Sequence, residues 1–199
     1  MSMYGFARGV VKSIFMPLYR VEIIGAENVP KEGGVLLCAN HIHNFDPPMV
    51  GITAPRPIHF MAKAELFKNP LANKLLTSIN AFPVRRGMSD REALRTGLKL
   101  LKEDRVLGLF PEGTRNTTGE VGKGLAGAGF FALRSKAQIV PCAIVGEYKA
   151  FKKLKVIYGK PIDFTELRAQ KVSAEVATDV IMDEIRKIWN EHQNSNVIA

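Results

Sequence analysis

Cysteine is scarce in this 199-residue sequence, which contains only Cys38 and Cys142. Both lie inside apolar runs typical of strands, and we interpret them as buried, reduced thiols. Two such cysteines argue against a disulfide framework and against a cysteine metal site. The sequence therefore favours a protein of the reducing cytoplasm.

Long apolar runs are absent as well. No uninterrupted apolar stretch reaches the length of about 18 residues that a transmembrane helix needs. The first 30 residues also lack a compact apolar stretch followed by a small-residue cleavage site. We therefore expect neither a transmembrane span nor a cleavable signal peptide.

The composition and the net charge indicate a folded, basic protein. Apolar residues make up 46% of the chain and charged residues 24%, and the length favours one domain. Lys and Arg total 28 against 19 Asp and Glu, so the net charge of +9 indicates an anionic partner. With one Trp and four Tyr, the chain lacks the basic and aromatic interleaving of proteins that stack bases. A phospholipid surface or a phosphorylated substrate is thus favoured over nucleic acid.

Residues 1–18 are predicted to form an amphipathic helix ahead of a main domain at 19–199. On a helical wheel the polar side carries Arg8 and Lys12 and no acid. Such a helix can lie in a membrane interface, and the alternative is a terminal helix packed on the domain. The apolar arc comprises Met3, Phe6, Ala7, Val10, Val11, Ile14 and Leu18. A basic run late in the chain is interpreted as a solvated face, with membrane contact as the second possibility. It comprises Lys149, Lys152, Lys153, Lys155 and Lys160.

Seven short apolar runs have the composition of β-strands and alternate with helical patterns. We predict an α/β fold, a single domain with a central, mostly parallel or mixed sheet flanked by helices. The strand-like runs are 19–25, 34–39, 57–62, 81–84, 106–110, 139–145 and 154–158, and the clearest helices are 90–103, 130–136 and 173–192. Ser89 and Glu92 have the spacing of a capping box at the start of the first of these helices.

A polar cluster follows the second strand-like run. His41 and Asp46 are five residues apart, so a tight turn can bring the carboxylate to one ring nitrogen and leave the other as a general base. The alternatives are a loop that caps the next helix, or a metal site with His43 as a third ligand. Because His59 and His192 are isolated, no second ligand cluster exists and we expect no metal.

Two further polar clusters also follow predicted strands. In the sequence Phe-Pro-Glu-Gly-Thr-Arg at 110–115, Glu112 and Arg115 can face a polar ligand, and the arginine suits a phosphate. Arg85 and Arg86 end another run, with surface solvation as their alternative. Three strand ends can therefore converge on one crevice. The sequence contains no nucleotide-binding glycine loop and no serine nucleophile elbow, so direct transfer to a bound hydroxyl is favoured over a covalent intermediate.

Four blocks in this order resemble the glycerolipid acyltransferase family, in particular its bacterial 1-acylglycerol-3-phosphate members. The resemblance spans residues 20–160. The blocks are Asn40, His41 and Asp46; Phe82, Pro83, Val84 and Arg86; the intact Phe-Pro-Glu-Gly-Thr-Arg at 110–115; and Val140, Pro141, Ile144, Val145 and Gly146.

The resemblance implies an enzyme that moves a fatty acyl chain from acyl-CoA or acyl carrier protein to the 2-hydroxyl of 1-acylglycerol-3-phosphate, giving phosphatidic acid. His41 would be the general base and Asp46 its orienting acid, and no cofactor is implied. The residues assigned to the acceptor phosphate are Arg86, Glu112, Gly113, Thr114 and Arg115. Other acceptors with the same chemistry are glycerol-3-phosphate, a lyso-aminolipid or another lysophospholipid, and a non-catalytic basic lipid-binding module is the alternative outside enzymes.

Asn40 and Phe82 are expected to support this site. His43 stands where the family often has serine, so it either bonds the oxyanion or fills space, and Asn80 stands where glycine is frequent. Lys63 either reaches a substrate phosphate or is solvated. We expect a peripheral protein at the cytoplasmic face of the membrane, with an anionic lipid surface and the two substrates as its partners.

Overall fold

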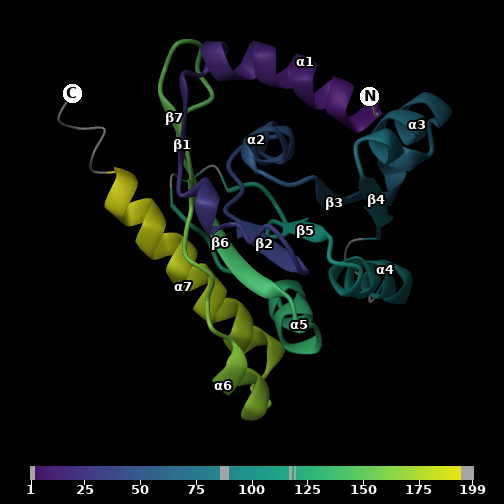
Figure 1. The fold of residues 1–199 in the computed structure, drawn as a ribbon, viewed down its shortest axis with the longest axis vertical. Coiled ribbons are helices and arrows are strands. Elements are labelled where there is room, and N and C mark those ends of the chain that lie inside the picture. The colour runs from purple at the N-terminus through teal and green to yellow at the C-terminus, as the bar shows by residue number, and fades with distance from the viewer. Residues whose placement is uncertain (1–2, 86–89, 117, 119, 194–199) are drawn as a thin grey trace.

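The computed structural model describes residues 3–85, 90–116, 118 and 120–193, which form one seven-stranded sheet covered by helices (Figure 1). The strand order is β1-β7-β6-β2-β5-β3-β4. The strands are β1 Val21–Ile24, β2 Val35–Ala39, β3 Ile58–Lys63, β4 Ala81–Val84, β5 Val106–Leu109, β6 Gln138–Gly146 and β7 Leu154–Tyr158. Each predicted strand is present. All pairings are parallel except β6 with β7, so the predicted α/β fold with a mixed sheet is confirmed.

Helices cover both faces of the sheet (Figure 1). They are α1 Met3–Leu18, α2 Asp46–Thr53, α3 Pro70–Ser78, α4 Arg91–Lys102, α5 Gly127–Arg134, α6 Thr165–Ala169 and α7 Ala174–Gln193, with short 3-10 turns η1 Ala26–Asn28 and η2 Ala64–Phe67. In β2, Val35 and Leu37 point to the core cluster shared with α1 and α2. Leu36 and Cys38 point to the cluster shared with α4, α5 and α7. This alternation buries β2 on both faces, and burial raises the pKa of the Cys38 thiol, which is free and reduced.

The helix α4 has a different cap from the one predicted. Its N-cap is Asp90, whose side chain accepts a hydrogen bond from the backbone N–H of Ala93 at 3.1 Å. Hydrogen bonds from the backbone of Arg85 and of Ala93 lower the pKa of Asp90. Ser89, the predicted cap, lies outside the described residues. Aspartate is as good a cap as serine, so the helix begins one residue later than the capping-box pattern indicated.

The N-terminal helix divides its apolar side chains between the core and the surface. Val11 and Phe15 pack against the core, whereas Phe6, Val10 and Ile14 are exposed. The helical wheel placed Arg8 on the polar side, opposite the apolar arc, and in the structure this residue faces the domain. Its guanidinium turns inward and donates to the carbonyl oxygens of Ile52 and Ala54 at the end of α2, because terminal helix carbonyls without partners attract a cation.

Candidate active site

His41 and Asp46 lie against each other beyond the carboxyl end of β2. Nδ1 of His41 is 2.7 Å from Oδ2 of Asp46, the contact that their spacing predicted. Asp46 is the first residue of α2, and its Oδ2 also accepts the backbone N–H groups of Ile42 and His43, both at 2.7 Å. Asp46 is fully buried. The carboxylate is therefore held in place, and it orients the His41 ring so that Nε2 is left for another partner.

Glu112 ties the backbone of His41 to the glycine-rich segment. Its Oε1 accepts the His41 N–H at 2.9 Å, and its Oε2 accepts the Gly122 N–H at 3.1 Å. A Cβ at Gly122 would lie 2.8 Å from Oε2, so a side chain there would push the carboxylate away from its present position. The resemblance assigned Glu112 to the acceptor phosphate. Both of its oxygens are already used and a carboxylate repels a phosphate, so these contacts favour a positioning role instead.

Two asparagines complete the support of the His41 backbone. Nδ2 of Asn40 donates to the backbone carbonyl of Ile144 on β6 at 3.0 Å, and Oδ1 of Asn40 accepts the backbone N–H of Ile144 at 2.7 Å. The backbone N–H of Asn116 donates to the His41 carbonyl at 2.7 Å. His41 is thus held through its N–H, its carbonyl and its ring, which fixes its geometry before any substrate arrives.

Aromatic rings surround the pair. The Phe110 ring stacks on His41 with centroids 4.4 Å apart, and the His43 ring stacks on Tyr148 at 4.6 Å. Nδ1 of His43 accepts the Phe45 N–H at 3.2 Å. Burial and the neighbouring Asp46 charge raise the pKa of Tyr148, so its hydroxyl stays protonated. His43 does not line the cavity beside His41, which favours packing over an oxyanion contact.

A cavity of about 560 Å³ opens beside His41. Its walls come from α1, α2, β3, η2, α3 and β4, and they are mostly apolar. The apolar lining consists of Ala7, Val11, Pro47, Pro48, Ile52, Ile58, Phe60, Met61, Ala62, Leu66, Leu76, Ile79, Ala81 and Phe110. Such a cavity suits a hydrocarbon chain. Because α1 forms one wall, the N-terminal helix belongs to the site as well as to the surface.

Polar side chains gather in the same cavity. Thr114, Arg115 and Lys63 line it together with His41. Gly113 has φ +69°, and its N–H closes a turn on the carbonyl of Phe110 at 3.0 Å, which brings the next two residues to the cavity. Within the described residues, the side chains of Lys63 and Arg115 form no ion pair. Both cations are therefore available to an anionic ligand.

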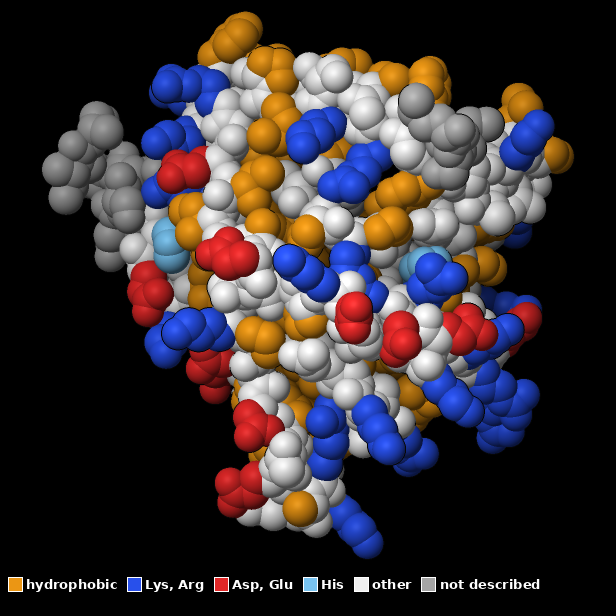
Figure 2. Space-filling view, in the orientation of Figure 1, with side chains coloured by type: hydrophobic (Ala, Val, Ile, Leu, Met, Phe, Trp, Pro, Cys, Tyr) orange, Lys and Arg blue, Asp and Glu red, His pale blue; other side chains and the backbone are white. Residues whose placement is uncertain are grey.

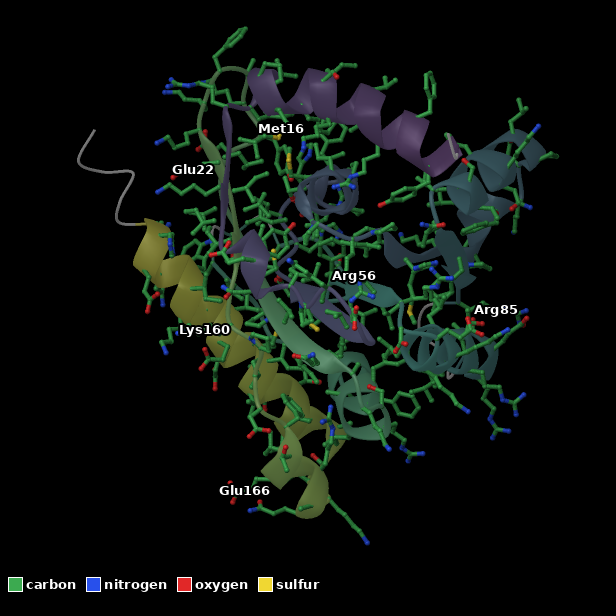
Figure 3. All side chains as sticks on the ribbon, viewed as in Figure 1. Met16, Glu22, Arg56, Arg85, Lys160 and Glu166 are labelled. Atoms are coloured by element: carbon green, nitrogen blue, oxygen red, sulfur yellow. The ribbon has the colours of Figure 1, made fainter. Side chains whose placement is uncertain are left out.

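Of the two arginines that follow β4, the structure describes Arg85 and not Arg86. Arg86 lies outside the described residues. Arg85 lies beside α4 (Figure 3), and its backbone N–H donates to Asp90 at 2.9 Å. Phe82 packs into the core cluster shared with α4, α5 and α7 and does not line the cavity, so it supports the fold instead of contacting a ligand.

Several contacts had no signal in the sequence. Tyr148, Asn116 and Gly122 are 75 to 107 positions from His41 along the chain, and only the fold brings them to this edge. In the described part of the chain, no group of three or more His, Cys, Asp or Glu side chains is arranged to hold a metal ion. None of the helices described here is long and apolar enough to cross a membrane.

The sequence matches the acyltransferase family over residues 20–145. It is 34% identical to the 1-acyl-sn-glycerol-3-phosphate acyltransferase of Bacillus subtilis, over 95% of this chain and 98% of the relative. The enzyme of the same name from Borreliella burgdorferi is 28% identical, over 88% of this chain and 74% of the relative. The crystal structure of the 1-acyl-sn-glycerophosphate acyltransferase from Thermotoga maritima has the same fold, with a TM-score of 0.69, 23% identity, and coverage of 94% of this chain and 82% of that one.

The match extends over more than half of the chain, and the Bacillus subtilis relative aligns with nearly all of it. The resemblance carried by the four sequence blocks is therefore confirmed. This chain belongs to the acyltransferase family, and it is an enzyme of acyl transfer.

Proposed function

We propose that this acyltransferase moves a fatty acyl chain from a thioester to the 2-hydroxyl of 1-acylglycerol-3-phosphate, giving phosphatidic acid. One observation carries the proposal: the oriented His41 lines an apolar cavity that also holds Lys63 and Arg115, two cations without an ion pair among the residues that the structure describes. A lysophospholipid has one apolar chain, one hydroxyl and one phosphate, which match these three features. The names of the two bacterial relatives support the same acceptor.

In the proposed reaction, Nε2 of His41 takes the proton of the acceptor hydroxyl as its oxygen attacks the thioester carbonyl. The tetrahedral intermediate then collapses, the carbon–sulfur bond breaks, and the thiolate leaves with a proton from His41. Asp46 stabilises the transient imidazolium through Nδ1. The donor is the thioester of acyl-CoA or acyl carrier protein. The steps are nucleophilic attack, loss of the thiolate and proton transfers through His41, so the proposed reaction involves no cofactor.

The phosphate of the acceptor is assigned to Thr114, Arg115 and Lys63, with the backbone at Gly113 shaping their approach. Arg86 stays in this assignment on the family resemblance alone. Glu112 takes a different role, which is to hold the backbone of His41. Asn40 has the same kind of role, since it anchors the end of β2 to β6.

The enzyme is proposed to work as a peripheral protein at the cytoplasmic face of the membrane. The outward face of α1 supports this location, because Phe6, Val10 and Ile14 are exposed there without an acidic neighbour on the helix. Deleting residues 1–18 is not a clean test of the location. The deletion would also remove Ala7 and Val11 from the cavity wall.

A panel of acceptors tests the reaction. Purified enzyme is incubated with acyl-CoA and with 1-acylglycerol-3-phosphate, glycerol-3-phosphate, a lyso-aminolipid or another lysophospholipid, and the lipid products are identified by mass spectrometry. Phosphatidic acid formed fastest from the first acceptor supports the proposal. A faster product from another acceptor would keep the chemistry and replace the substrate, and no acylated product from any acceptor would favour a non-catalytic lipid-binding module.

Arg115→Ala is expected to raise KM for the acceptor by roughly 10- to 100-fold, because a hydrogen bond between charged partners contributes about 1.5–3 kcal/mol. The kcat value is expected to change much less, since the phosphate is bound in both the ground state and the transition state. Initial rates are measured against acceptor concentration at saturating acyl-CoA. Arg134→Ala on α5 is the control, because Arg134 lies over the Phe130 ring and does not line this cavity. An unchanged KM in Arg115→Ala would remove Arg115 from the phosphate site.

A further inference from the structure

The loop between β6 and β7 carries a phenylalanine in an unfavourable setting. Phe151 is 72% exposed, and its backbone has φ +63°. A bulky side chain is disfavoured at positive φ, and an exposed aromatic ring gains no burial in the fold. The positive φ costs stability and the exposed ring contributes none, so the fold itself gives no reason for a phenylalanine here. Such outliers often mark a functional contact.

Lysines lie on both sides of Phe151 in the sequence, and some of them have a partner in the protein whereas others do not. Lys153 pairs with Glu22 on β1 at 3.3 Å, next to the loop, and Figure 3 labels Glu22 there. Lys149 and Lys152 are exposed and make no ion pair within the described part of the chain. Lys155, from the same basic run, is buried and donates to the His192 carbonyl. The predicted solvated face is thus split, and two unpaired cations remain beside Phe151.

The loop is joined to the exposed face of α1. The backbone N–H of Phe151 donates to the carbonyl of Leu18, the last residue of α1, at 2.6 Å. Figure 1 shows α1 along the top edge of the molecule, with this loop at one end and α3 at the other. Hydrophobic side chains follow this edge in Figure 2, and Lys and Arg side chains lie at its left end. The apolar stripe of α1 therefore continues into the loop.

We propose that the loop 149–152 is a membrane anchor, in which Phe151 inserts into an anionic phospholipid bilayer while Lys149 and Lys152 contact lipid phosphates. The inference rests on the proposed location of the enzyme at a membrane and names a second point of attachment beside α1. An aromatic ring between two lysines suits the interface, where the ring leaves water and the ammonium groups remain at the headgroups. Insertion buries the exposed ring, which the fold leaves in water.

The anchor sets the orientation of the active site. If α1 were the single attachment, the whole enzyme could rotate about the axis of this helix on the membrane. A second contact at the carboxyl end of α1 prevents this rotation. Ala7 and Val11, on the inner side of α1, line the cavity of His41. With Phe6, Val10 and Phe151 all in the bilayer, the inner side of α1, which forms one wall of the cavity, would lie next to the lipid headgroups. A lysophospholipid can then enter without crossing bulk water.

Phe151→Trp tests insertion directly. With vesicles of phosphatidylcholine and phosphatidylglycerol, the added indole emission is expected to shift to the blue and to be quenched by bromine-labelled lipid tails. The wild type, whose only tryptophan is Trp189 on α7, supplies the baseline. Val176→Trp is the matched control, since Val176 is 48% exposed at the start of α7, away from this edge. An unshifted, unquenched emission at position 151 would overturn the anchor.

Phe151→Gly separates binding from folding. Glycine accepts positive φ, so the thermal midpoint is expected to stay equal or to rise, whereas vesicle affinity is expected to fall about tenfold on loss of the ring. Lys149→Gln and Lys152→Gln are each expected to weaken sedimentation with anionic vesicles by about fivefold and to have little effect with pure phosphatidylcholine. Unchanged sedimentation of all three variants would contradict the proposal.

Thiol release with a short-chain, monomeric acceptor keeps the two proposals apart. Phe151→Gly is expected to match the wild type in this assay, because no membrane is involved. Loss of vesicle binding with retained turnover supports the anchor. Wild-type turnover together with unchanged vesicle binding in the variants overturns the anchor and leaves the reaction standing. A wild type without turnover on any acceptor would contradict the reaction, whatever the vesicles show.

Discussion

His41→Ala is expected to lower thiol release from acyl-CoA by roughly 100- to 10,000-fold, the usual contribution of a positioned general base. The loss follows from the geometry, since Asp46 holds Nδ1 of this ring and leaves Nε2 as the group next to the cavity. The release is followed with a thiol reagent at saturating acceptor. Circular dichroism and the thermal midpoint check that the variant is folded.

His43→Ala is the matched control for this experiment. His43 is two residues away, carries the same ring, and stacks on Tyr148 without lining the cavity. Its replacement is expected to cost much less turnover than that of His41. Asp46→Asn keeps the size of the side chain and is expected to lose most of the activity, because the amide no longer stabilises an imidazolium. If His41→Ala kept turnover within about tenfold of the wild type, His41 would not be the base.

Glu112→Ala is expected to lower the free energy of unfolding by about 3 kcal/mol, because it leaves two backbone N–H groups without their acceptor. Those groups belong to His41 and Gly122, at 2.9 and 3.1 Å from the carboxylate. Turnover is expected to fall as well, since the backbone of His41 loses one of its supports. Urea unfolding followed by circular dichroism measures the first effect, and thiol release measures the second.

Glu103→Ala is the surface control for Glu112. The side chain of Glu103 forms an exposed pair with Lys99 at 3.8 Å, and such pairs contribute about 0–1 kcal/mol. Glu112→Gln offers a milder change, because its amide keeps one acceptor oxygen and loses the other. A stable Glu112→Ala variant whose only defect is a raised KM for the acceptor would restore the phosphate contact that the family resemblance implied.

The strands and the central contact of the site could be predicted from the sequence. Buried strands such as β2 are short, continuous apolar runs, and their carboxyl ends lie together once the strands are parallel. The five-residue spacing of His41 and Asp46 allowed a contact that the turn before α2 then forms. Both predictions depend on short-range chemistry, which a sequence displays directly.

The features of the site that the sequence did not predict depend on contacts between distant segments. The helical wheel placed Arg8 on the polar side of the N-terminal helix but named no partner for it. In the structure its guanidinium donates to carbonyl oxygens at the end of α2. Glu112 was assigned to a polar ligand from its place in a polar block after a strand and from the family resemblance, and the sequence did not show that it accepts the backbone N–H groups of His41 and Gly122. The cavity itself is made by six elements, so no local pattern could reveal its apolar walls.

The central claim is acyl transfer to the 2-hydroxyl of 1-acylglycerol-3-phosphate. Its most direct test is thiol release by the wild-type enzyme with acyl-CoA and detergent-dispersed 1-acylglycerol-3-phosphate, read together with the mass of the lipid product. Both protein thiols are buried, so the reagent reports the substrate. We predict that one thiol is released for each phosphatidic acid formed, and only when the acceptor is present. No release with this acceptor, in enzyme that is folded, would contradict the account.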